Sequence, residues 1–199
     1  MNYLAHAYLS FGHPEILLGN MISDFVKGKK KFDYPLLVQN GITLHRAIDD
    51  FTDNHESTKK AKSYFKPFYG LYAGAFIDIV YDYFLANDEK EFSPGNLLGF
   101  STTTYQQLEM QRILFPEKFA AVFYYMQLHN WLYNYQFKEG IIKSFGGLVH
   151  RALYIEDSSV ANIIFENNFD ALKNCYADFF PALKQFSFER FKQLPGFNE

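Results

Sequence analysis

The sequence predicts an all-α protein, folded as a single compact domain of about seven or eight helices over residues 1–199. Apolar residues recur at helical spacing along much of the chain. Alternating β-branched runs are scarce, and no Asn-Gly or Asp-Gly hairpin is recognisable between such runs. Hydrophobic residues make up 48% of the chain and aromatic residues 20%, which is enough for one sizeable core.

The first well-defined helix is expected to begin at Tyr34-Pro35, because proline is favoured in the first turn of a helix. Its apolar face, which includes Leu44 and Ile48, runs to about residue 53. A second and more buried helix is expected over residues 70–87. Later helices are expected after a Ser93-Pro94 cap, from Pro116 to about Phe137, between Gly140 and Leu153, over 158–165, and over 167–193, with Pro181 kinking or splitting the last.

Composition and targeting signals indicate a soluble, cytoplasmic protein. Cys175 is the only cysteine, so an intramolecular disulfide is excluded. The first ten residues carry no basic segment followed by an apolar one, and no apolar run approaches the roughly 20 residues of a membrane span. We expect neither a membrane nor a nucleic acid as a partner, and the sequence leaves the oligomeric state open.

The charge is unevenly distributed. The whole chain has a net charge of −3, yet residues 27–66 hold nine Lys and Arg against five Asp and Glu. A solvated surface is the simpler interpretation. The alternative is a docking segment for an acidic partner, because clustered charge steers association.

Histidine and aspartate occur at helical spacing in GITLHRAIDDFTDNHE, residues 41–56. His45 and Asp49 are four residues apart, so they point to the same face of the expected helix. His55 and Glu56 lie beyond its expected end. The same spacing relates Asp78 to Asp82 in the apolar stretch FIDIVYDYFL. Buried carboxylates are costly unless they are paired or bind a metal, so capping or tyrosine-bonded aspartates compete with a shared metal site.

Three other residues are candidates with a structural alternative each. Asp24, in GNMISDFVKG, is either a site residue or a helix cap. His6, in MNYLAHAYLS, is either a ligand or a satisfied core histidine. Arg46 has a planar guanidinium that suits a phosphate or a carboxylate, and a surface ion pair is the alternative. Imidazole and carboxylate donors together suit zinc, manganese or iron, and a carboxylate-rich set favours Mn²⁺ or Mg²⁺.

Four of these stretches resemble the bacterial acyl carrier protein phosphodiesterases. The motifs MNYLAHAYLS, GNMISDFVKG, GITLHRAIDDFTDN and DIVYDYFL occur in that order within the first 85 residues. The remaining residues match mainly in length and in helical, aromatic character. The resemblance implies an all-helical relative of the HD-type metal-dependent phosphohydrolases. It implies removal of the 4′-phosphopantetheine arm from holo-acyl carrier protein with a divalent cation, most often Mn²⁺.

The resemblance also implies a ligand set. Asp24 matches the aspartate of the family's GN-x-x-x-DF segment, and His45 and Asp49 match its HR-x-ID segment. These three residues and Asp78 are the expected metal ligands, with His6 as a fifth. An adjacent His-Asp dipeptide, the usual HD signature, does not occur in this sequence, so the ligands of ordinary HD enzymes do not transfer directly.

Further roles follow from the same resemblance. Arg46 is expected to hold the phosphate, and either Asp24 or Asp82 to act as general base. Asp82 and Asp53 are also candidates for orienting a ligand imidazole. The holo-acyl carrier protein is expected to dock on residues 27–66. Two alternatives remain open at this point: an HD-like phosphohydrolase acting on a nucleotide or another small phosphodiester, and a helical carrier-protein-binding protein without catalysis.

Overall fold

The structure is a computed structural model that describes residues 1–196. It contains eleven α-helices and four short 3₁₀ segments in that range, with no strand among the described residues. The predicted all-α class is therefore confirmed. Helices outnumber the seven or eight expected, partly because α1 (Tyr3–Tyr8), α2 (Pro14–Ile22) and α4 (Glu56–Tyr69) lie in segments where the sequence pattern assigned none.

The other helices follow the expected order. The predicted helix from Tyr34-Pro35 is α3 (Leu36–Asn54), and the predicted buried helix is α5 (Ala73–Ala86). The later helices are α6 (Asn96–Glu109), α7 (Glu117–Leu128), α8 (Trp131–Asn134), α9 (Lys138–Arg151), α10 (Ser159–Asn167) and α11 (Phe169–Lys192), and the 3₁₀ segments are Ser23–Phe25, Gly28–Asp33, Gly70–Tyr72 and Arg112–Leu114.

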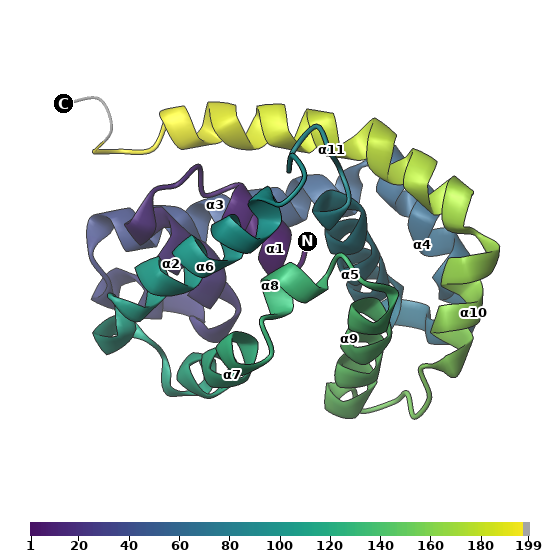
Figure 1. Cartoon of the computed structure of the whole chain (residues 1–199). Helices are drawn as coiled ribbons and strands as arrows, with labels where there is room; N and C mark the ends of the chain where they lie inside the picture. Colours follow the sequence, from purple (N-terminus) through teal and green to yellow (C-terminus); the bar gives the residue numbers. More distant parts are fainter. Residues whose placement is uncertain (197–199) are drawn as a thin grey trace.

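Two local differences have backbone causes. The helix predicted to reach Phe137 ends at Leu128, because Asn130 adopts a left-handed conformation with φ 42° and turns the chain into α8. Gly140 lies inside α9 instead of preceding it, and a Cβ there would approach the carbonyl oxygen of Asn134 to 1.9 Å. Pro181 does not split α11, which curves across one side of the molecule (Figure 1).

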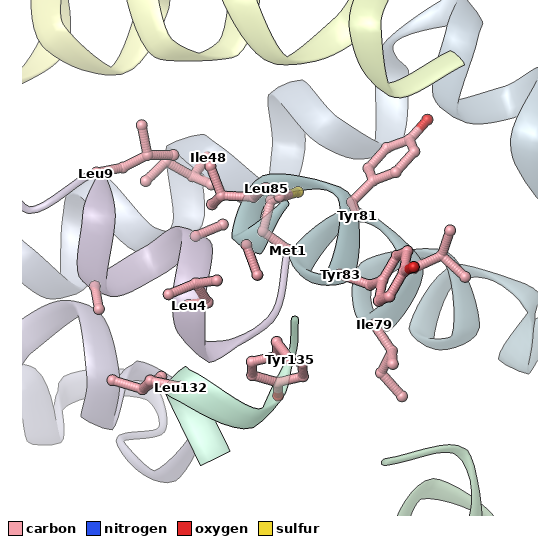
Figure 2. Packing of buried hydrophobic residues seen from close by; sticks show 14 of the residues in the cluster. Met1, Leu4, Leu9, Ile48, Ile79, Tyr81, Tyr83, Leu85, Leu132 and Tyr135 are labelled. Atoms are coloured by element: carbon pink, nitrogen blue, oxygen red, sulfur yellow. The ribbon is translucent and has the colours of Figure 1, made fainter. Parts of the chain in front are cut away.

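One hydrophobic cluster runs through the described chain, from Met1 to Leu194. Helix α11 packs against α3, α4 and α5, and α5 in turn packs against α1 and α9. Figure 2 shows part of this core, where Leu85 of α5 lies near Met1 and Ile48. Within residues 1–196 no helix combines the length and apolar character required to cross a bilayer.

The backbones of helices α2 and α3 approach each other closely at a pair of glycines. A Cβ on Gly19 would lie 2.1 Å from the carbonyl oxygen of Val38, and one on Gly41 would lie 2.3 Å from that of Ile16. Both glycines are therefore required by space, since neither has the left-handed backbone that favours glycine for conformational reasons. Their contact sets Asn20, the residue after Gly19, directly against α3.

Asp82 of α5 anchors the short helix α1. Its side chain is fully buried, and its two oxygens accept the backbone N–H groups of Leu4 at 2.7 Å and Ala5 at 3.1 Å. These are donors that the first turn of a helix leaves without an internal partner. Burial raises the pKa of Asp82 to about 7, although the two N–H groups oppose the shift. The carboxylate thereby fixes where α1 begins.

We expect Gly41→Ala to lower the free energy of unfolding by about 3 kcal/mol, because the added Cβ overlaps backbone that cannot move without separating α2 from α3. The matched control is Gly99→Ala in α6, where an added Cβ meets nothing within 4 Å. That change should raise the unfolding free energy by about 0.5–1 kcal/mol, since alanine is the better helix former. Chemical denaturation measures both, and equal stability of the two variants would contradict the close contact.

Candidate metal centre

Three side chains from two helices meet at one point. His6 of α1 and His45 and Asp49 of α3 each offer one ligand atom, and these atoms lie within 4.8 Å of one another. Both histidines are buried, while the Asp49 side chain is 39% exposed. The cluster is therefore reached from solvent on its carboxylate side.

Asn20 orients both imidazoles. Its side-chain amide nitrogen donates to the carbonyl oxygen of His6 at 3.0 Å and to Ser10 Oγ at 3.1 Å, so its amide oxygen faces His6 Nδ1 at 2.9 Å. Its backbone oxygen accepts from His45 Nδ1 at 2.8 Å. Both Nδ1 atoms therefore carry a proton, so Nε2 is the ring atom through which each histidine could bind a cation.

The two rings stack with centroids 3.9 Å apart and an interplanar angle of 17°. His45 Nε2 lies 3.0 Å from Asp49 Oδ2 and 3.3 Å from Asp24 Oδ1. His6 Nε2 lies 3.2 Å from Asp49 Oδ1, yet it is a buried nitrogen that makes no hydrogen bond to any described residue. A buried ring nitrogen without a hydrogen bond, beside a second imidazole and a carboxylate, fits a divalent cation as the missing partner.

The two histidines of the cluster have pKa values shifted in opposite directions. Burial, and then the proximity of His45, lower the pKa of His6 to about 4, so His6 is neutral at pH 7. Burial also opposes a charge on His45, but hydrogen bonds to Asp24 and Asp49 outweigh it and raise its pKa to about 9. The hydrogen bond from His45 lowers the pKa of Asp24. Cation binding would therefore displace a proton from His45 and leave the carboxylate ionised.

Asp78 lies next to the cluster without joining it. Its Oδ1 is 3.2 Å from the amino group of Met1, which is fully buried and also lies 3.3 Å from Asp49 Oδ1. The amino group therefore stands between the Asp78 and Asp49 carboxylates. Burial raises the pKa of Asp78, and the positive amino group opposes that shift.

The remaining predicted residues lie away from the three-residue cluster. Arg46 is exposed, and its Nη2 donates to the carbonyl oxygen of Val26 at 3.1 Å. Asp82 is occupied by the first turn of α1, and Asp53 forms a surface ion pair with Lys62 at 2.6 Å. The structure therefore brings together His6, Asp24, His45 and Asp49, places Asp78 beside them, and separates Arg46, Asp53 and Asp82 from them.

A cavity of about 310 Å³ opens onto the cluster, and its lining includes His6, His45 and Asp24. Arg151, at the end of α9, also lines this cavity and brings a guanidinium group to it, whereas Arg46 does not line it. Sequence reasoning missed both Asn20 and Arg151. Asn20 adjoins Gly19 in the motif that contains Asp24, which is a usable signal. Arg151 carries no signal in the sequence, because only the tertiary fold brings α9 to the cluster.

We expect Asn20→Ala to weaken Mn²⁺ binding by about 10- to 100-fold, because it removes the hydrogen bond that fixes the tautomer and orientation of His6. Isothermal titration calorimetry measures the dissociation constant. The control is Asn54→Ala on α3, whose side chain is exposed and bonds only to Asp50.

In a His6→Ala background the Asn20 substitution should cost little further affinity, since the group that it orients is already gone. A full additional loss in the double variant would show that Asn20 acts on the cation by another route. Unchanged affinity in Asn20→Ala alone would remove its assignment as the orienting residue.

Comparison with known proteins places this chain in a family. Residues 1–183 match the family described as Acyl carrier protein phosphodiesterase. Curated proteins of that name from Enterobacter sp. (strain 638) and Serratia proteamaculans (strain 568) are both 30% identical to the chain, covering 92% and 93% of it and 95% and 96% of their own lengths. One from Escherichia coli O6:H1 is 28% identical over 93% of the chain and 96% of its own length. No solved structure matches. The chain belongs to the acyl carrier protein phosphodiesterase family.

Proposed function

We propose that the protein hydrolyses the phosphodiester that joins 4′-phosphopantetheine to a serine of holo-acyl carrier protein, giving apo-acyl carrier protein and 4′-phosphopantetheine. The observation that carries the proposal is the cluster of His6, His45 and Asp49, in a chain that belongs to the phosphodiesterase family. Two imidazoles held through Nδ1, with their Nε2 atoms beside carboxylates, suit a cation-assisted phosphodiester hydrolysis.

His6, His45 and Asp49 would hold the cation, with Asp24 alongside them. The mixed nitrogen and oxygen donors favour Mn²⁺, and Mg²⁺ is the alternative. The chemistry that a bound cation supplies is charge stabilisation at the phosphoryl oxygens and a more acidic water. A carrier-protein substrate would place the enzyme in the cytoplasm.

The chain's own residues supply the other parts of the reaction. Asp24 is exposed at the cavity and hydrogen-bonds His45, so we assign it as the base that takes the proton of the attacking water. Asp82 is unsuited to that task because its oxygens already accept two backbone N–H groups. We assign the phosphate contact to Arg151, which lines the cavity, in place of Arg46. The bond from phosphorus to the seryl oxygen of the carrier protein breaks, and that oxygen takes up a proton to become the serine hydroxyl.

The predicted docking segment, residues 27–66, divides into two parts in the structure. Lys29 and Lys30 are exposed on the 3₁₀ segment Gly28–Asp33, which begins four residues after Asp24. Lys59 and Lys60 are exposed on α4. We propose that the acidic carrier protein contacts the first part, because it lies closer along the chain to the site at which its serine must arrive.

Mass spectrometry of holo-acyl carrier protein incubated with the protein and Mn²⁺ should show loss of the 4′-phosphopantetheine mass. Asp49→Asn should reduce this reaction to background, because it removes a ligand charge from the cluster. Asp50→Asn, at the exposed neighbouring position, is the matched control and should retain full activity. If folded wild-type protein leaves several holo-carrier proteins intact, the proposed function is wrong.

Reversing Lys29 and Lys30 to Glu should raise KM for holo-acyl carrier protein about tenfold at low salt, with little change in kcat, because rim charges act mainly on association. The control is the same reversal at Lys59 and Lys60. A larger effect from the α4 pair would move the docking surface to that helix. Loss of kcat in either variant would instead indicate damage to the site.

A further inference from the structure

A second and larger cavity adjoins the cluster cavity and has no part in the cluster itself. Its volume is about 620 Å³, within the range of small-molecule sites. The two cavities share three lining residues, Asn2, Tyr3 and Arg151. We refer to the larger one as the outer cavity.

One face of α9 forms a wall of the outer cavity. Gly140, Lys143, Ser144, Gly147 and Arg151 all line it, at intervals of three, one, three and four residues. This i, i+3, i+4, i+7, i+11 pattern places all five positions on one side of a helix. Arg151 ends this face, at the junction with the cluster cavity.

Helix α8 and its flanking residues supply a mixed polar and aromatic wall. Asn130 and Asn134 bring carboxamides, while Trp131 and Tyr135 bring aromatic rings. Trp131 lies 6.2 Å from the ring of Tyr3, which lines both cavities. Asn130 Oδ1 is a buried acceptor with no hydrogen-bond partner among the described residues. Such an atom is costly to leave unpaired.

We infer that the outer cavity binds the pantetheine part of the substrate, with Arg151 at the phosphate between the two cavities. This inference rests on the proposed function. A phosphodiester held at the cluster has two substituents, and the folded carrier protein is too large to enter a cavity. The slender arm is the substituent that fits. Its amides match the carboxamides of Asn130 and Asn134, and its methyl groups match the rings of Trp131 and Tyr135.

The test fills the cavity with a side chain. Gly147→Leu places a leucine on the cavity-lining face of α9, where an added Cβ meets only the Arg151 side chain, at 3.8 Å. Gly146→Leu is the matched control, because Gly146 is the neighbouring helical glycine, lines neither cavity, and has nothing within 4 Å of an added Cβ. Ser144→Leu is a second, independent filling variant.

Binding is measured first, with 4′-phosphopantetheine itself. Trp131 is the only tryptophan and lines the outer cavity, so its fluorescence reports a ligand there. Wild type and Gly146→Leu should show the same saturable change, and both filling variants should bind at least tenfold more weakly. No fluorescence change in wild type, or equal affinity in the filling variants, overturns the inference.

Activity then separates the two proposals. Gly147→Leu should lower kcat/KM for holo-acyl carrier protein at least tenfold, while the rise in Tm on adding Mn²⁺ stays as in wild type, because the cluster is untouched. Wild-type turnover in both filling variants also overturns the inference. Absence of hydrolysis by wild type refutes the proposed function instead, and the fluorescence titration still decides what the outer cavity binds. If Gly147→Leu does not fold, Ser144→Leu supplies both measurements.

Discussion

The candidate site depends on one backbone contact, the approach of α2 to α3 at Gly19 and Gly41. No side chain larger than hydrogen fits at either position, because carbonyl oxygens of the opposite helix occupy the space. The contact sets Asn20 against His45 on one side and against His6 on the other. Three helices are thus held in register by one asparagine, and the ligand geometry follows from helix packing rather than from a loop.

Much of this arrangement could be predicted from the sequence, and the limit has a physical cause. Spacing on one helix predicts that His45 and Asp49 lie together, because i and i+4 residues share a face wherever that helix packs. Spacing could not place His6 with them, since α1 reaches α3 only through tertiary packing; the resemblance to a family supplied that residue. Arg46 and Arg151 show the same limit. Both are arginines on predicted helices, and only the packing of α9 decides which one lines the cavity.

Local backbone events explain the remaining differences. Helix α7 ends because Asn130 adopts a left-handed conformation, which asparagine tolerates better than most residues. The residues around Asn130 carry no signal that predicts this conformation. The same break creates α8, whose residues line the outer cavity.

The carboxylates are also ambiguous in the sequence. Asp78 and Asp82 have the same spacing as a ligand pair, yet one faces an amino group and the other supports a helix start. The relation to HD-type enzymes and the choice of Mn²⁺ stay predictions.

The shortness of α1 has a consequence for how the protein responds to its cation. Six residues are far fewer than the roughly 12 that an isolated helix needs in water, so α1 persists only through its contacts. Asp82 holds its beginning, and His6 holds its middle to Asn20. A cation that binds His6 adds a further attachment, so occupancy of the site and protection of α1 against local opening are thermodynamically linked. Amide hydrogen exchange at Leu4 and Ala5 would therefore slow when the cation binds, and its rate would report whether the site is occupied.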